Sequence, residues 1–168
     1  MNYKNIPFGD FEKFNVIIEI PKGSENKYEY DEKLDAVKLQ WVFKKGFGFP
    51  FDYGFIPQTL AEDNDEVDVF VIAEHSFYPN IVVECKPIGM IDVLDRGEKD
   101  NKIIAIPLAD PDYSKYESLN DLFFDYKKVF KDFFKELGIQ KDKKIEITGF
   151  SDKTAAIEYI KESLEKPQ

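Results

Sequence analysis

A dense group of carboxylates marks one short segment of the sequence. Five acidic residues fall within the seven positions Glu62–Asp68, and Asp63, Asp65 and Asp68 form the pattern D-x-D-x-x-D. Carboxylate oxygens are the ligands that Mg²⁺ and Ca²⁺ prefer, and a carboxylate can also accept a proton from an attacking water. The segment is therefore a candidate for cation binding and for acid–base chemistry.

The residues that follow argue against the usual interpretation of such a run, a solvated loop. The composition of Val67–Ile72 is that of a β-strand. Alternation puts Asp68 on the same face as Phe70 and Ile72, so both faces are apolar and the strand should be central. No Lys or Arg occurs between Gly46 and Cys85. A buried Asp68 therefore needs a bound cation, or a base that the fold brings from elsewhere.

An EF-hand calcium loop fits the acidic segment poorly. Glu74 falls at the twelfth position of such a loop, as required. However, Val67 stands where a ligand is needed and Asp68 where the loop needs Gly. The chain also continues as a strand and not as a helix, so we set this interpretation aside.

Other polar residues could join the same site. Asp95–Lys102 is a second acidic segment, which on its own would be interpreted as a surface turn. Glu19 and the triplet Lys27–Glu29 belong to early strands, and Tyr53 precedes the first acidic segment. A site built from these residues would need strands that are far apart in the sequence to meet.

The elements that must position these residues are mainly strands, followed by two helices. Composition and alternation predict strands at 14–20, 28–30, 37–43, 67–72, 81–94, 102–106 and 144–147. The segment 81–94 is one bent strand or two strands, because Pro87 and Gly89 interrupt a ladder. Helical periodicity predicts one helix from Ser118 to about Leu137, ending at Gly138, and a second capped by Ser151. This order indicates an α+β fold with a small closed barrel.

Length, charge and cysteine content limit the class of protein. The chain has 168 residues, so 1–168 are expected to form a single domain. It has no apolar run that could span a membrane and no signal-peptide core, and Cys85 is its only cysteine, which favours a cytoplasmic location. The net charge of −10 argues against binding nucleic acid. It is compatible with phosphate chemistry in which carboxylates hold the cations.

In their order and spacing, these segments resemble the family I soluble inorganic pyrophosphatases. The match extends from about Val16 to Phe150 and rests on Ile18–Pro21, Lys27–Glu29, Tyr53–Gly54, Asp63–Val69, Cys85–Gly89 and Asp95–Lys102. The resemblance implies a five-stranded OB-like β-barrel with two flanking helices. It also implies magnesium-dependent hydrolysis of pyrophosphate, with Mn²⁺ or other divalent cations as alternatives.

The resemblance implies a role for each candidate residue. The expected cation ligands are Asp63, Asp68, Asp95, Asp100 and Glu19. Asp65 is the expected general base for the attacking water. The expected substrate-binding residues are Lys27, Tyr53 and Lys102, together with Glu29, which would contact a cation carried by the substrate.

The chain departs from the family pattern on the side that binds phosphate. Trp41 stands where the family has an Arg that grips phosphate, and Leu137 and Gly138 stand where it has a Tyr-Lys pair. The loss of these groups predicts slow hydrolysis of pyrophosphate unless other cations compensate. The candidates for compensation are Arg96, which is the only arginine, Lys44 and Lys45.

Two further functions stay open at this point. One is a non-catalytic member of the family that binds cations or a partner protein. The other is a hydrolase of a different phosphoanhydride. The expected partners are pyrophosphate or a related small phosphate compound and, by analogy with bacterial relatives, further copies of the chain, but neither nucleic acid nor a membrane.

Overall fold

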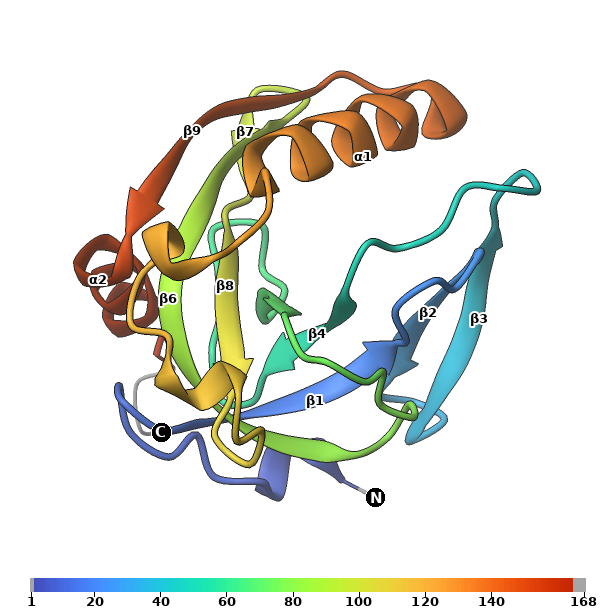
Figure 1. Cartoon of the computed structure of the whole chain (residues 1–168). Coiled ribbons are helices and arrows are strands. Elements are labelled where there is room, and N and C mark those ends of the chain that lie inside the picture. The colour runs from blue at the N-terminus through green and yellow to red at the C-terminus, as the bar shows by residue number, and fades with distance from the viewer. Residues whose placement is uncertain (1, 165–168) are drawn as a thin grey trace.

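At the centre of the structure, a computed structural model that describes residues 2–164, five strands form a closed sheet (Figure 1). In the order of pairing they are β1 (Phe14–Ile20), β4 (Asp52–Ile56), β5 (Val67–Val71), β8 (Lys102–Pro107) and β6 (Val82–Asp95). β6 pairs back with β1, which closes the ring. The pairs are antiparallel except β5 with β8. The predicted α+β fold, an OB-like five-stranded barrel with two flanking helices, is confirmed.

The other strands extend this sheet or form a separate hairpin. β7 (Glu98–Lys99) and β9 (Ile145–Asp152) pair with β6, whereas β2 (Asn26–Asp31) and β3 (Ala36–Val42) form a two-stranded sheet of their own. The helices are α1 (Tyr126–Lys141) and α2 (Lys153–Ser163), and short 3-10 turns cover Tyr3–Asn5, Tyr113–Lys115 and Leu119–Asp121. Figure 1 shows α2 against β6 and β9, with α1 and the β2–β3 hairpin at separate sides of the barrel.

Aromatic packing fixes α1 on the barrel. Phe130 and Phe133 are buried, and their rings lie 5.0 Å from that of Phe70 and 4.9 Å from that of Phe49, respectively. Such aromatic pairs each add about 0.5–1.5 kcal/mol beyond the area that they bury. Ile160 of α2 is buried in a second cluster on the other face of the sheet. The two helices are therefore packed on opposite faces of the sheet.

Most of the strand predictions are confirmed. β1 has the predicted bounds, and β5 lies between β4 and β8, as the two apolar faces of Val67–Ile72 require. β6 is one bent strand whose register shifts between Pro87 and Gly89. No helix within residues 2–164 is both long and apolar enough to cross a membrane.

The sequence analysis does not predict β4, because β4 lacks alternation: all of its residues are buried. Gly54, which weakens the strand pattern, is required by the packing. A Cβ atom at this position would lie 1.9 Å from the carbonyl oxygen of Ile17 in the neighbouring strand. The glycine lets β1 and β4 approach each other, and the neighbouring residue of β4, Tyr53, pairs with Ile20 of β1.

Both helix starts differ from the prediction. Ser118 begins only a 3-10 turn, where its backbone N–H donates to the Asp121 carboxylate at 3.0 Å. α1 begins at Tyr126, with Asp125 as its N-cap, and α2 is capped by Asp152. The predicted first helix was too long at its start because the apolar spacing continues through a segment that is not helical.

The end of α1 is also different, and this matters for the site. The helix does not stop at Gly138 but continues to Lys141, with Asp142 in the left-handed conformation at φ 48°. The chain then turns back over Gly138, where a Cβ atom would lie 2.8 Å from the carbonyl oxygen of Lys143. Gly138 thus permits a close turn, and it is not the residue that ends the helix.

Candidate active site

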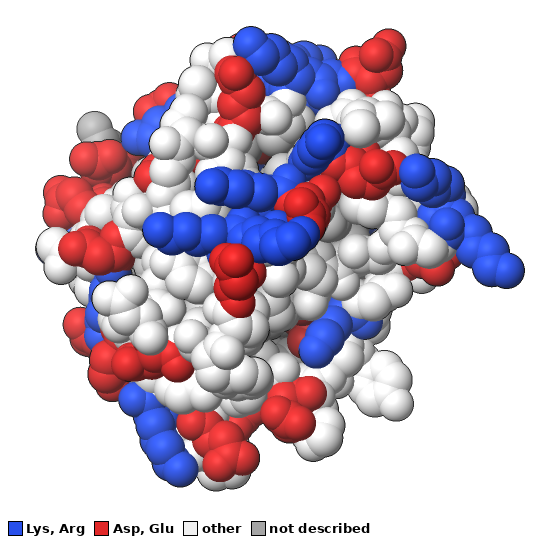
Figure 2. All heavy atoms as spheres, turned by 45° about the horizontal axis from the view of Figure 1, so that its top comes forward, with Lys and Arg blue, Asp and Glu red and all other residues white. Residues whose placement is uncertain are grey.

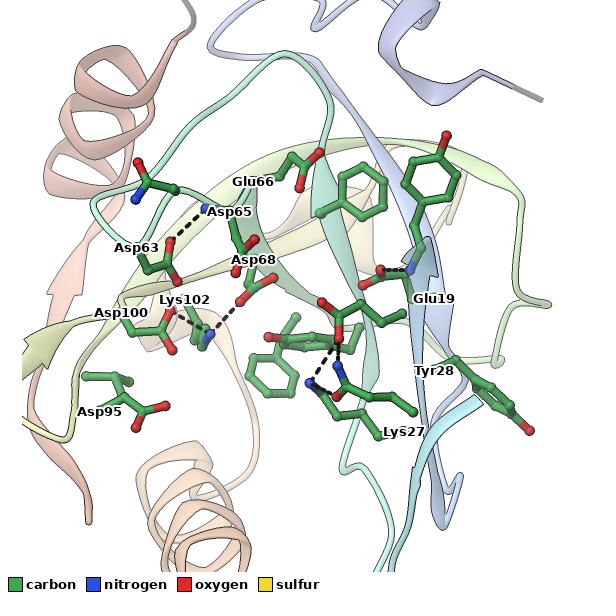
Figure 3. A pocket seen from close by; sticks show the side chains of 18 of the residues that line it. Glu19, Lys27, Tyr28, Asp63, Asp65, Glu66, Asp68, Asp95, Asp100 and Lys102 are labelled. Atoms are coloured by element: carbon green, nitrogen blue, oxygen red, sulfur yellow. Dashed lines mark hydrogen bonds and ion pairs between the residues drawn. The ribbon is translucent and has the colours of Figure 1, made fainter. Parts of the chain in front are cut away.

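One cavity of about 900 Å³ is lined by every residue that the sequence analysis assigned to the site. These residues are Glu19, Lys27, Glu29, Tyr53, Asp63, Asp65, Asp68, Asp95, Asp100 and Lys102. In Figure 3, Asp63, Asp65, Asp68 and Asp100 lie together on one side of the pocket and Lys27 lies on another. The barrel strands, the β2–β3 hairpin and the end of α1 all contribute to the walls.

The first acidic segment forms a tight turn before β5. The Asp63 carboxylate accepts a hydrogen bond from the backbone N–H of Asp65 at 3.1 Å, and the Ala61 N–H donates to the Asp65 carbonyl at 2.8 Å. Asn64 has φ 65°, a value that Asn tolerates better than most residues. The turn presents Asp63 and Asp65 to the cavity next to Asp68, the second residue of β5.

The second acidic segment is a hairpin between β6 and β7. Arg96 and Gly97 have φ 52° and 83°, as a type I′ turn between the paired residues Asp95 and Glu98 requires. Asp95 Oδ2 accepts a hydrogen bond from Lys143 Nζ at 2.6 Å. Its Oδ1 is buried without a hydrogen bond, and Arg96 Nε lies 3.4 Å away. Asp95 therefore keeps one oxygen available for another ligand.

Lys102 is the distant base that Asp68 needs. Its Nζ lies 2.5 Å from Asp68 Oδ2 and 2.8 Å from Asp100 Oδ1, and its side chain is only 7% exposed. Burial lowers the pKa of Lys102, but Asp68, Tyr53 and Asp100 together raise it well above its usual value. Tyr53, whose ring centre is 5.9 Å from the same ammonium, has its pKa raised by burial and by Asp68.

Glu19 and the β2–β3 hairpin form the opposite wall. Glu19 is buried and accepts a hydrogen bond from the Tyr30 backbone N–H at 2.8 Å. Lys27 Nζ donates to Gln40 Oε1 at 2.5 Å and lies 3.6 Å from Glu29 Oε2, which also accepts a hydrogen bond from Gln40. This wall therefore carries both a carboxylate pair and a cation.

The crowding of carboxylates changes their pKa values. Burial raises the pKa of Glu19 to about 8 and that of Asp100 to about 6, with Asp68 adding to both shifts. The pKa of Asp65 is also raised, by burial and by the negative charge of Asp63 and its neighbours. Burial is the largest cause of each shift, and the neighbouring carboxylates act in the same direction, so a bound cation would favour the charged form of these groups.

The donor set of the cavity suits Mg²⁺. In residues 2–164 no group of three or more His, Cys, Asp or Glu side chains is arranged to hold a metal ion, and Lys102 pairs with both Asp68 and Asp100. However, Mg²⁺ usually keeps several waters and needs only one or two carboxylates directly. The buried Asp95 Oδ1 without a hydrogen bond and the raised pKa of Asp100 are what such a cation would relieve.

Four lysines that the sequence analysis did not name also line the cavity: Lys4, Lys99, Lys141 and Lys143. Lys141 and Lys143 reach it because α1 is longer than predicted and because the chain turns over Gly138. Trp41, Leu137 and Arg96 line the cavity as well, whereas Gly138, Lys44 and Lys45 do not. Lys44 Nζ instead lies 2.6 Å from the Glu136 carboxylate. The phosphate-binding side of the cavity therefore has more positively charged side chains than the sequence analysis predicts.

The raised pKa of Glu19 predicts how pH affects the metal-free protein. The folded state keeps a proton on Glu19 up to about pH 8, whereas the unfolded chain loses it near the ordinary glutamate pKa of 4.5. Stability should therefore fall as pH rises from 6 to 8, by about 1 kcal/mol per pH unit. Thermal melts in EDTA measure this. Glu19→Gln should make the melting temperature less dependent on pH. A wild-type melting temperature that does not fall between pH 6 and pH 8 would contradict the prediction.

Figure 2 shows Lys and Arg side chains lying next to Asp and Glu side chains on one face of the molecule. Charges of both signs therefore share that face. Around the cavity they are held on a rigid barrel: carboxylates from the β4–β5 turn and the β6–β8 segment, and lysines from β2, β8 and the end of α1. The arrangement can bind divalent cations beside a polyanion.

Comparisons with known proteins agree with this geometry. Residues 16–168 match the family model described as Inorganic pyrophosphatase. The chain is 39% identical over 148 residues to the inorganic pyrophosphatase of Synechocystis, covering 88% of each chain. It is 39% identical to that of Saccharolobus solfataricus over 158 residues, or 92% of each. The crystal structure of the Thermus thermophilus inorganic pyrophosphatase superposes with a TM-score of 0.90 and 36% identity, over 98% of this chain and 97% of that one. The chain therefore belongs to the family I soluble inorganic pyrophosphatases.

Proposed function

We propose that this protein hydrolyses inorganic pyrophosphate to two phosphates, with Mg²⁺ as the cofactor. The observation that carries the proposal is a single cavity in which Asp63, Asp68 and Asp100 face Lys27, in a chain of the inorganic pyrophosphatase family. Pyrophosphate carries several negative charges and repels both the carboxylates and a hydroxide nucleophile. Bound Mg²⁺ would neutralise the substrate and make a coordinated water acidic enough to attack.

In this proposal, Asp63, Asp68 and Asp100 hold the activating cations, and Asp95 and Asp100 hold a further one. The buried Asp95 Oδ1, which has no hydrogen bond, supports this assignment. Glu19 is an outer ligand. Mg²⁺ is preferred over a softer metal because the cavity offers oxygen ligands and the chain has only one His and one Cys. Mn²⁺ or another hard divalent cation could replace it.

Asp65 accepts the proton of the attacking water. Its carboxylate lines the cavity and makes no hydrogen bond or ion pair within the described residues, and its raised pKa favours proton transfer near neutral pH. Lys27, Tyr53 and Lys102 bind phosphate oxygens, and Glu29 contacts a cation carried by the substrate. Lys102, paired with Asp68 and Asp100 in the structure, exchanges these carboxylates for a phosphate oxygen when substrate binds.

A phosphate-release assay tests the function. The purified protein is given pyrophosphate, tripolyphosphate or ATP, each with Mg²⁺, with Mn²⁺ or with EDTA. We expect phosphate release from pyrophosphate to be fastest, to require a divalent cation and to stop in EDTA. Faster cleavage of tripolyphosphate or ATP would instead indicate a hydrolase of another phosphoanhydride. Cation binding without hydrolysis of any of them would indicate a non-catalytic member of the family.

Four further properties remain predictions. We expect residues 1–168 to act as a single domain, the protein to lie in the cytoplasm, several copies to assemble into a homo-oligomer, and nucleic acid not to bind. Light scattering coupled to size-exclusion chromatography measures the assembly. The net charge of −10 remains the argument against nucleic acid.

A further inference from the structure

Lys141 differs from the other lysines of the cavity in having no carboxylate partner among residues 2–164. Each of the others pairs with an acid: Lys4 with Glu32, Lys27 with Glu29, Lys99 with Glu62, Lys102 with Asp68 and Asp100, and Lys143 with Asp95. Lys141 instead lies against an aromatic ring, with Nζ 5.7 Å from the centre of the Trp41 indole. A cation on the face of an indole keeps its N–H donors available for another ligand.

The backbone holds these two side chains together from separate elements. Trp41 lies on β3 directly opposite Lys27 of β2, so both side chains belong to the same part of the hairpin. Lys141 is in the last turn of α1, where the helix dipole favours a positive charge. Its position depends on the turn over Gly138 that also brings Lys143 to the cavity.

The positive charges around Lys141 favour the binding of an anion. Burial and the positive charges of Lys27 and Lys143 together lower its pKa to about 8, although Glu29 and Asp95 act in the opposite direction. Three lysines whose positive charges act on one another thus line a cavity that also carries the acidic residues Asp63, Asp68 and Asp100. A phosphoryl group placed among them would remove their repulsion and supply acceptors for their donors.

We propose that Lys141, held on the indole of Trp41, binds a phosphoryl group of pyrophosphate together with Lys27. The inference rests on the proposed function and deepens it. It means that the missing phosphate-binding cation is replaced from the end of α1. Arg96 also lines the cavity but lies 3.4 Å from the Asp95 carboxylate, and Lys44 and Lys45 do not line it. In this arrangement, Trp41 and Gly138 position Lys141. Because Lys141 then compensates for the missing cations, we no longer expect the slow hydrolysis of pyrophosphate that the sequence predicts.

Trp41 is the only tryptophan, so its fluorescence reports on this place directly. We would titrate the protein in Mg²⁺ with methylenediphosphonate, a pyrophosphate analogue with a carbon bridge, and follow the Trp41 emission, with calorimetry as the second measurement. Lys141→Met keeps a side chain of similar length against the indole but removes the charge. It should weaken analogue binding and lower kcat/KM on pyrophosphate by about tenfold to a hundredfold. Lys141→Arg should restore most of both.

Lys44→Ala is the matched control, because it removes one lysine that is near in space to α1 but does not line the cavity. It should leave affinity and kcat/KM within about twofold. Analogue affinity that is unchanged in Lys141→Met, or a wild-type protein that does not bind the analogue, would overturn the inference. Analogue binding that weakens in Lys141→Met while wild type hydrolyses no pyrophosphate would support it and refute the proposed function instead.

Discussion

Asp65→Asn should lower kcat on pyrophosphate by about 10²–10⁴-fold, the usual contribution of a general base. Asn has nearly the same shape as Asp but cannot accept the proton of the attacking water. In the described residues the Asp65 carboxylate makes no hydrogen bond or ion pair, and its backbone groups provide the turn contacts. The substitution should therefore leave the free energy of unfolding within about 0.5 kcal/mol of the wild-type value.

Steady-state kinetics and thermal melts of the same preparation measure both effects. Glu62→Gln is the matched control, because Glu62 belongs to the same acidic segment and is exposed, with only Lys99 3.9 Å away. It should keep kcat close to that of wild type. If Asp65→Asn retained a wild-type kcat, Asp65 would have no part in the proton transfer.

Asp68→Asn should abolish most of the stabilisation by Mg²⁺ and raise the Mg²⁺ concentration needed for half-maximal activity at least about a hundredfold. Even a residue that only supports a metal ligand commonly contributes ten- to a hundredfold to metal affinity. In wild type, Mg²⁺ at about 100 times its Kd should add about 2.7 kcal/mol to the free energy of unfolding, because it binds only the folded state. For a chain of this size this corresponds to about 5–10 °C in Tm.

Magnesium titrations of Tm and of phosphate release measure this prediction. Asp31→Asn serves as the control: Asp31 pairs with Lys38 at 3.8 Å on the β2–β3 hairpin and does not line the cavity. It should respond to Mg²⁺ as wild type does. Two results would contradict the role of Asp68 as a cation ligand. One is a wild-type Tm that does not change in millimolar Mg²⁺, and the other is an Asp68→Asn variant that needs the same Mg²⁺ concentration as wild type for half-maximal activity.

The acidic side of the site could be predicted from the sequence because its signals are local. The D-x-D-x-x-D spacing, and the strand that follows it, lie within ten consecutive residues, 63–72. The alternation of that strand also identifies β5 as central, and so predicts that Asp68 needs a partner. Which partner it has could not be predicted, because Lys102 comes from the next strand of the closed sheet, β8, 34 residues further along the chain.

The basic side could not be predicted because it depends on where a helix ends. Glycine after an apolar helix is the usual stop signal, and Gly138 was interpreted as one. In the fold, Gly138 is instead the contact point over which the chain returns, so the helix continues and ends with Lys141 facing Trp41. The two cases differ in a local backbone contact that the residue pattern does not reveal: the Lys143 N–H donates to the Gly138 carbonyl at 3.0 Å, next to the left-handed Asp142.

The central claim is that carboxylates hold divalent cations on one side of the cavity while lysines bind phosphate on the other. A crystal structure of the protein with Mn²⁺ and phosphate tests it most directly, because the anomalous signal of Mn²⁺ locates the cations. We expect Mn²⁺ among Asp63, Asp68 and Asp100, and a phosphate in contact with Lys27 and Lys141. Manganese bound away from these carboxylates, or phosphate bound outside the cavity, would contradict the claim.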